Sequence, residues 1–327
     1  MKRSSHPSQQ LKVYIALRQR YALFGAMDTR FYVRDCKITK KLINKRKMKN
    51  YTKAPLPFQG QKRGFLKLFK ECLNDFNDKV IFVDLFGGSG LLAHTIKQQR
   101  PDARVIYNDY DWYINRLNNI SRTNDLLAKI RFEIQDFTRG GGFSKKVRLP
   151  EELRRKILQI IYDEEQKGYV DYITLSASLL FSGQFATSYE ELAKECFYNK
   201  IKQSEYNADG YLDGVEITHI DYKVLFSLYK YLPNVCFVLD PPYLSTDCSS
   251  YTSYWGLKDY LEVLDLLQWT SYFYFTSNKT SIVELCQWLT MHPNIGNPLE
   301  GAQCKEVAVN INKTSKYKDM MFYKKIG

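Results

Sequence analysis

The sequence lacks the features on which several classes of protein depend. Its seven cysteines form no Cys-x-x-Cys pair and only four histidines could complete a metal site, so we expect reduced thiols and no bound metal. Its longest apolar runs, residues 80–86 and 235–239, have the length of strands and fall far short of the roughly 18 residues that a membrane span needs. The sequence therefore predicts a soluble protein with no membrane partner.

Positive charge is plentiful but unevenly distributed. Residues 1–53 contain 15 lysines and arginines and two acids, whereas the rest of the chain carries 33 charges of each sign. Such an excess suits contact with nucleic-acid phosphates, yet it resides in one terminal segment. We interpret residues 1–53 as a basic extension, in which residues 1–47 are either a disordered DNA-tethering arm or sequence upstream of the true start at Met48. A transit peptide is the rival interpretation, because the first 27 residues contain no acid.

Helix and strand patterns alternate from residue 62 onward, which predicts an α/β fold with a parallel sheet. Buried strands are predicted at residues 80–83, 104–107 and 131–134, with helices between them. The pattern is then interrupted by mixed helix and loop, and it resumes with strands at 235–239 and 271–275 and a hairpin at 307–311 and 319–323. Seven strands are expected in one domain, residues 54–137 and 235–327, with a second domain, residues 138–234, inserted.

A glycine-rich turn, Asp-Leu-Phe-Gly-Gly-Ser-Gly at 84–90, follows the first predicted strand. Glycines at a strand-to-helix turn let a ligand approach the backbone and the helix N-terminus. The spacing matches neither the dinucleotide fingerprint nor the phosphate loop, which disfavours a nicotinamide or a nucleoside triphosphate. Asp84, Phe86, Gly88 and Gly90 are therefore candidate cofactor residues, and a tight turn without a ligand is the alternative.

Acids follow the next two predicted strands. Asp109 ends the second, where an acidic side chain accepts hydrogen bonds from ribose hydroxyls. Asp136 ends the third, where it is a candidate for binding the adenine of a cofactor. The alternatives are a helix cap, which we favour for Asp111, and a turn residue at Asp136.

The tetrapeptide Asp240-Pro241-Pro242-Tyr243 directly follows the buried strand 235–239, at the end of a strand where open sheets bind ligands. It suits an exocyclic amine whose lone pair is delocalised into a base, because the Asp240 carboxylate and the Pro241 carbonyl can accept the amine hydrogens. Tyr243 offers a face on which a base removed from its stack can lie. The four residues are predicted to be catalytic, and a rigid loop without chemistry is the alternative.

In this order, the glycine turn and the tetrapeptide resemble the Dam-like family of DNA adenine-N6 methyltransferases, with the motif order of its alpha type. The segment Phe-Gln-Gly-Gln-Lys at 58–62 is similar to an upstream element of that family, although Gln61 stands where a second glycine is usual. The segment Phe-Thr-Ser-Asn at 275–278 and the closing hairpin continue the resemblance, which runs from about residue 55 to the end and is weak between 138 and 234. It implies a Rossmann-like seven-stranded methyltransferase sheet with a terminal antiparallel hairpin and an inserted, mostly helical recognition domain.

The resemblance also implies the chemistry. S-adenosylmethionine, held in part by Phe58, Gly60 and Lys62, would give its methyl group directly to an adenine flipped out of double-stranded DNA, with no metal. A cytoplasmic monomer of bacterial, phage or prophage origin follows, with a companion restriction endonuclease as a further partner. RNA adenine or DNA cytosine-N4 is the alternative substrate, and a catalytically silent DNA-binding protein is the alternative of another class.

Candidate DNA contacts lie mostly in the predicted recognition region. A basic loop offers phosphate contacts, and polar side chains further on could reach base edges. The alternative is a solvated surface for the charged and polar side chains, and packing in the core for Tyr254. The candidates are Arg139, Lys145, Lys146, Arg148, Gln184, Lys200 and Tyr254.

Overall fold

The computed structural model describes residues 49–135, 137, 147–181, 184–242, 256–268, 270–292, 296–310 and 316–326. The predicted basic extension lies almost entirely outside these ranges. Six predicted site residues also lie outside them: Asp136, Arg139, Lys145, Lys146, Tyr243 and Tyr254.

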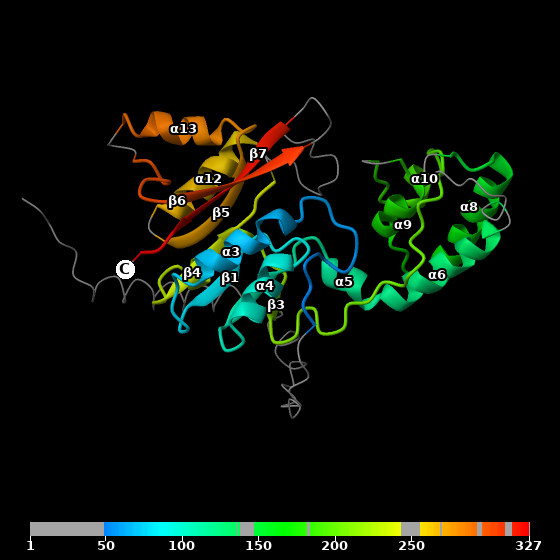
Figure 1. Cartoon of the computed structure of the whole chain (residues 1–327), viewed down its shortest axis with the longest axis horizontal. Coiled ribbons are helices and arrows are strands. Elements are labelled where there is room, and N and C mark those ends of the chain that lie inside the picture. Colours follow the sequence, from blue (N-terminus) through cyan, green and yellow to red (C-terminus); the bar gives the residue numbers. More distant parts are fainter. Residues whose placement is uncertain are drawn as a thin grey trace, which may run out of the picture. The chain divides into compact units, whose positions relative to one another are not determined.

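Within the described residues, seven strands form one sheet in the order β3-β2-β1-β4-β5-β7-β6 (Figure 1). The strands are β1 (Ile81–Asp84), β2 (Val105–Asn108), β3 (Glu216–Thr218), β4 (Val235–Leu239), β5 (Ser271–Ser277), β6 (Gln303–Asn310) and β7 (Lys316–Lys324). Strands β1 to β5 run parallel, and β7 runs antiparallel to both β5 and β6. The expected Rossmann-like sheet with a terminal antiparallel hairpin is confirmed.

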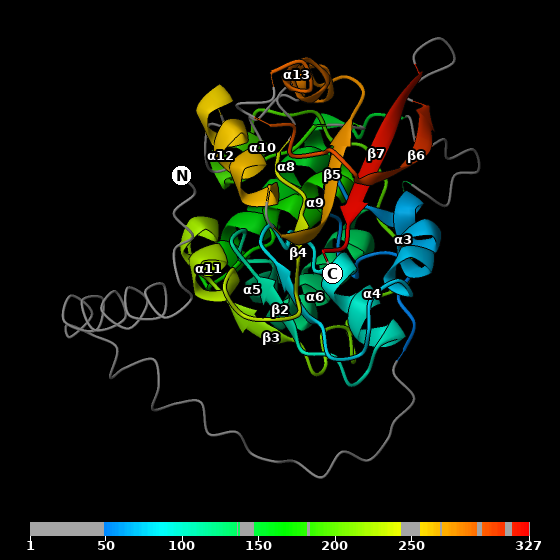
Figure 2. The ribbon, with the colours of Figure 1, turned by 90° about the vertical axis from the view of Figure 1, so that its left-hand side faces the viewer.

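Helices cover both faces of this sheet (Figure 2). One face carries α3 (Leu66–Leu73), α4 (Leu91–Gln99) and α5 (Tyr113–Asn118). The short helix η1 (Arg63–Phe65) directly precedes α3. The other carries α11 (Tyr222–Tyr229), α12 (Leu257–Leu267) and α13 (Ile282–Leu289).

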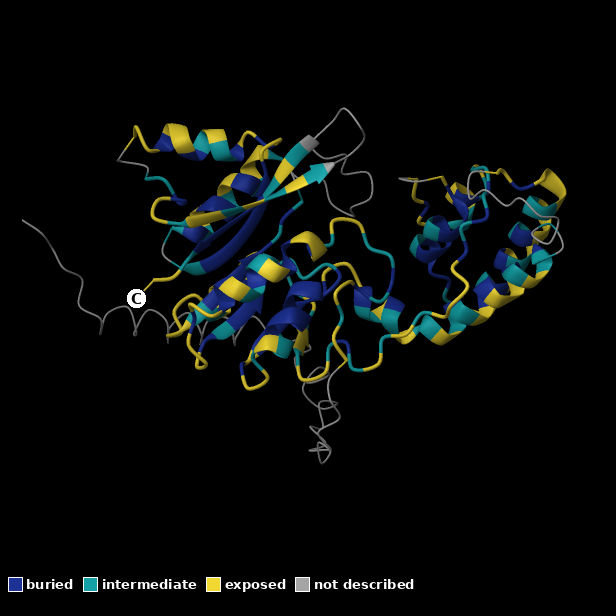
Figure 3. Ribbon diagram, in the orientation of Figure 1, coloured by how far each residue is buried: buried dark blue, intermediate teal, exposed yellow. Residues whose placement is uncertain are grey.

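The central strands are buried on both faces, because alternate side chains enter different cores. Phe82 and Val238 pack with the helices of the first face, whereas Val83 and Phe237 pack with those of the second. All four are essentially inaccessible to solvent, as the dark blue strands show (Figure 3). The continuous apolar runs in the sequence therefore correspond to strands that are covered on both sides.

A separate helical segment, residues 120–206, has a hydrophobic core of its own. It contains α6 (Ile120–Glu133), α8 (Glu151–Glu165), α9 (Tyr172–Leu179) and α10 (Tyr189–Leu192). Among all the residues that the structure describes, no helix is both long and apolar enough to cross a membrane.

The strand predicted at residues 131–134 is wrong. This stretch belongs to the end of α6, where Leu126, Ile130 and Ile134 are buried at helical spacing and Phe132 is exposed. The third strand is β3, which pairs with β2 at the edge of the sheet. Its three residues have little burial, so no apolar run marks it in the sequence.

Candidate active site

A cavity of about 960 Å³ lies at the carboxyl ends of β1, β2 and β4, the edge at which open α/β sheets bind ligands. Its walls come from the loop 58–65, from residues that follow these strands, from the start of α11 and from the hairpin. The cavity brings together eight of the predicted site residues: Phe58, Gly60, Lys62, Phe86, Gly88, Asp240, Pro241 and Pro242.

The turn between β1 and α4 is packed so closely that it requires glycines. A Cβ atom on Gly87 would lie 2.2 Å from the ring of Tyr107, and Gly88 has the left-handed φ of +49°. The Tyr107 hydroxyl donates a hydrogen bond to the Gly88 carbonyl at 2.7 Å, which fixes the turn. Gly90 is the N-cap of α4. Packing against Tyr107 and the left-handed backbone therefore require glycine at 87 and 88, and Gly88 is the glycine of this turn that lines the cavity.

Asp84, the last residue of β1, is fully buried, and neither carboxylate oxygen makes a hydrogen bond of standard geometry. Burial raises the pKa of this carboxyl to about 8, and the negative charge of Asp240 adds to the rise. The nearby amide of Phe86 offsets the rise only in part. A buried carboxyl whose oxygens lack such hydrogen bonds costs stability, so Asp84 is a candidate to receive a positive charge or hydrogen-bond donors from a ligand.

Asp240 follows β4 and forms an ion pair with Lys62, whose Nζ lies 2.6 Å from Oδ2. The same Nζ donates to the Gly60 carbonyl at 2.8 Å, which ties the loop 58–62 to the carboxylate. Burial raises the pKa of Asp240, Lys62 lowers it, and the charge of Asp319 raises it further. Lys62, predicted as a cofactor residue, thus also orients the predicted catalytic acid.

The two prolines that follow Asp240 line the same cavity. The hydroxyl of Tyr260, on α12, donates a hydrogen bond to the Pro242 carbonyl. The proline-rich turn is therefore held from the second face of the sheet. Tyr243, the remaining member of the tetrapeptide, lies outside the described residues.

The two acids after β2, Asp109 and Asp111, have exchanged the surroundings that the sequence predicted for them. Asp109 is buried and accepts hydrogen bonds from the amides of Tyr113 and Ile114, at 2.7 and 3.0 Å, so its carboxylate caps α5. Asp111 instead lines the cavity, beside Tyr110. The capping interpretation that the sequence favoured for Asp111 therefore applies to Asp109, which leaves Asp111 as the acid that can reach a ligand.

Two cavity residues, Asp221 and Tyr222, were missed by the sequence analysis. They begin α11 shortly after β3, and Asp221 accepts a hydrogen bond from the Lys223 amide at 2.7 Å. The rings of Phe86 and Tyr222 lie 4.8 Å apart. The signal was an acid and an aromatic residue following a strand, and it was lost because the third strand was placed at 131–134.

The described DNA-contact candidates are Arg148, Gln184 and Lys200. Arg148 is exposed, and its backbone forms an isolated bridge with Tyr198. Gln184 and Lys200 line a second cavity of about 250 Å³, together with Phe58. Both side chains have partners inside the segment: Gln184 donates to Glu195, and Lys200 donates to the Leu180 carbonyl. Their role in binding DNA stays a prediction.

The donor set does not suggest a metal centre. Within the described ranges, no group of three or more histidine, cysteine, aspartate or glutamate side chains could hold a metal ion.

Comparison with known proteins bears directly on this site. A family model described as D12 class N6 adenine-specific DNA methyltransferase matches residues 58–267, which include the loop at Phe58, the glycine turn and the Asp240 loop. A curated Haemophilus influenzae protein (strain ATCC 51907 / DSM 11121 / KW20 / Rd) named "Putative methyltransferase" is 38% identical over 284 residues, which cover 84% of this chain and 93% of that protein. A solved structure of precorrin-6y C5,15-methyltransferase from Geobacter metallireducens GS-15 aligns over 81% of this chain and 90% of that one, with 11% identity and a TM-score of 0.29. That score is too low for any argument about the site.

Proposed function

Because the chain belongs to the D12 class N6 adenine-specific DNA methyltransferases, we propose that it binds S-adenosylmethionine in the 960 Å³ cavity and methylates an adenine turned out of the DNA duplex onto Asp240. When bound, the cofactor supplies an activated methyl group on a sulfonium. The observation that carries the proposal is that Asp240, Pro241 and the glycine turn share one cavity.

The residues present fit this cofactor. Its cationic ammonium group would pair with the buried carboxyl of Asp84, whose oxygens make no hydrogen bond of standard geometry. Asp111 and Asp221 supply acceptors for ribose hydroxyls and for the adenine amine, and the apolar faces of Phe86 and Tyr222 suit an adenine ring. Asp221 thus takes the role that the sequence analysis gave to Asp136.

The catalytic step follows from the acceptors at the Asp240 loop. Lys62 engages Oδ2 of Asp240, and the other carboxylate oxygen would accept one hydrogen of the target amine. The Pro241 carbonyl can accept the other, because proline keeps its acceptor. Two acceptors draw the amine lone pair out of conjugation and toward the methyl group. The Asp240 carboxylate and the solvent then take up the proton that the amine loses.

The helical segment 120–206 is proposed to read the target sequence. It has its own core and presents exposed side chains, including Arg148 and Phe181. A monomer is also proposed as the catalytic unit.

The test is incubation of the purified protein with unmethylated genomic DNA and S-adenosylmethionine. Nucleoside mass spectrometry identifies the product, and single-molecule sequencing maps the modified positions. We expect N6-methyladenine confined to one short motif. N4-methylcytosine, or transfer only to RNA, would overturn the substrate, and cofactor binding without any product would favour the silent DNA-binding protein.

A further inference from the structure

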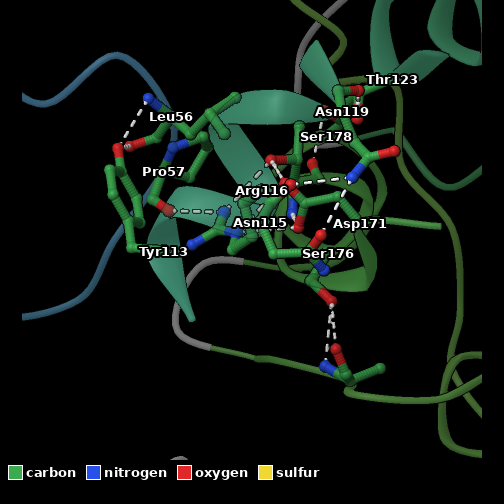
Figure 4. Close-up of polar contacts among 12 residues, drawn as sticks. Leu56, Pro57, Tyr113, Asn115, Arg116, Asn119, Thr123, Asp171, Ser176 and Ser178 are labelled. Carbon is green, nitrogen blue, oxygen red and sulfur yellow. Dashed lines mark hydrogen bonds and ion pairs between the residues drawn. The ribbon is translucent and has the colours of Figure 1, made fainter. Parts of the chain in front are cut away.

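Arg116 is a buried cation at the meeting point of three segments (Figure 4). It lies on α5, and its Nε is 3.1 Å from both carboxylate oxygens of Asp171, the N-cap of α9. One terminal nitrogen donates to the Pro57 carbonyl at 2.8 Å and to the Thr174 hydroxyl at 3.3 Å. One guanidinium therefore joins the sheet domain, the helical segment and the loop that carries Phe58.

Tyr113 reinforces this junction from the same helix. Its hydroxyl exchanges hydrogen bonds with the backbone of Leu56, at 3.1 and 3.3 Å. Its ring meets the ring of Phe58 edge-on at 5.6 Å, and the Arg116 guanidinium lies 5.3 Å from the ring centre. The backbone at 56–58 is thus fixed by two neighbouring side chains of α5.

The fixed loop is a wall common to two cavities. Phe58, Gln59 and Gln61 line the cofactor cavity on one side and the 250 Å³ cavity on the other. The second cavity is completed by residues of the helical segment, among them Phe181 and Lys200. The next residue of the loop, Lys62, forms the ion pair with Asp240. A shift of this loop would change both cavities and the catalytic carboxylate together.

We propose that Arg116 is a positioning residue that couples DNA contact by the helical segment to cofactor binding. The inference rests on the proposed function, because it takes the first cavity as the cofactor site and the helical segment as the DNA reader. Arg116 transmits any movement of α9 to the Pro57 carbonyl, and thus to the loop that lines the cofactor cavity. Coupling of this kind is reciprocal, so DNA tightens cofactor binding by the factor by which cofactor tightens DNA binding.

The test compares, between the wild type and Arg116→Lys, how strongly DNA changes the affinity for the cofactor product. Calorimetry measures the dissociation constant of S-adenosylhomocysteine with and without a saturating duplex that contains the mapped methylation motif. In the wild-type protein we expect the duplex to tighten binding at least about fivefold. In Arg116→Lys we expect the duplex to tighten S-adenosylhomocysteine binding by less than about twofold, because an ammonium cannot maintain the forked contacts of a guanidinium. The affinity without DNA should change less than about threefold.

Arg122→Gln is the matched control. Unlike Arg116, Arg122 lies within the helical segment, on α6, and bonds across to α8, donating to the Glu164 carbonyl at 2.6 Å. Its described polar contacts do not include the loop at Pro57. This variant should lower thermal stability and retain the wild-type coupling. If Arg116→Lys is too unstable to purify, Thr174→Val replaces it, since it removes the hydroxyl that donates to Asp171 at 2.6 Å and accepts from Arg116 at 3.3 Å.

The outcomes separate the inference from the proposed function. A wild-type enzyme that methylates adenine but shows equal cofactor affinity with and without DNA overturns the coupling alone. So does an Arg116→Lys or Thr174→Val variant that keeps the wild-type ratio, or an Arg122→Gln variant that loses it. A wild-type protein that neither binds S-adenosylhomocysteine nor methylates DNA overturns the proposed function, and the inference with it.

Discussion

Two buried carboxylates, Asp84 at the end of β1 and Asp171 in the helical segment, have opposite surroundings. Asp171 accepts hydrogen bonds from the Arg116 guanidinium and from both the amide and the hydroxyl of Thr174. Asp84 has no hydrogen bond of standard geometry, and Asp240 places a second negative charge nearby. Buried polar groups are usually satisfied. The satisfied carboxylate therefore marks a structural junction, and the unsatisfied one is where the proposed cofactor would supply a partner.

The largest expected effect on stability comes from breaking the satisfied pair. Asp171→Asn should lower the free energy of unfolding by about 3–5 kcal/mol, because the buried Arg116 loses its counter-charge. Urea unfolding followed by circular dichroism measures the change. A loss below about 1 kcal/mol would mean that Asp171 and Asp84 are energetically alike, and the comparison would fail.

The largest expected effect on activity comes from Asp240. Asp240→Ala should lower kcat by about 100- to 1000-fold, because one acceptor of the amine hydrogens is lost. Steady-state methylation assays measure kcat, and calorimetry with S-adenosylhomocysteine should show a change in affinity below about threefold. Equal losses of turnover and of cofactor affinity would contradict the catalytic role.

Asp84→Asn should separate function from stability. It replaces a carboxyl whose ionised form lacks hydrogen bonds, so the free protein should be as stable as the wild type or more so. Cofactor affinity should fall by about 10- to 100-fold, the value of a hydrogen bond to a charged group. Differential scanning fluorimetry and calorimetry measure the two quantities. A large loss of stability together with normal affinity would reverse the interpretation.

The pH dependence of stability tests the same carboxyl. Its pKa is about 8 in the folded chain and near its ordinary value of 3.8 in the unfolded chain, so between these values only the folded chain retains the proton. The free energy of unfolding should therefore fall as pH rises from about 4 to about 8, by up to about 1.4 kcal/mol per pH unit. Urea unfolding between pH 5 and 8 should show a smaller slope in Asp84→Asn. Identical slopes would exclude a titrating Asp84.

The smallest effect is expected on the surface of the helical segment. Lys129 is half exposed and bonds to Glu164 at 2.6 Å. Lys129→Ala should lower the free energy of unfolding by less than about 1 kcal/mol, because exposed ion pairs contribute little and Lys167 also bonds to Glu164. Urea unfolding at low and high salt measures this change in the free energy of unfolding. A loss above about 2 kcal/mol would mean that the Lys129–Glu164 pair stabilises the protein as strongly as the buried Arg116–Asp171 pair.

What is local in the chain could be predicted from the sequence. The strand at Val235–Leu239 has the predicted bounds, because a buried apolar run marks its own structure. The glycine turn and the Asp240 loop were found in the same way, since both directly follow buried strands. Shared strand ends then bring them to one cavity.

Tertiary structure alone decided what depends on distant partners. Strand β3 is three residues long and little buried, and it exists because β2 pairs with it. That pairing places Asp221 and Tyr222 at the cavity, while the contacts of α5 turn Asp109 into a cap. Arg116 meets Pro57 and Asp171 across gaps of more than fifty residues. No local pattern encodes such contacts, because their free energy arises only when packing excludes water from all the partners at once.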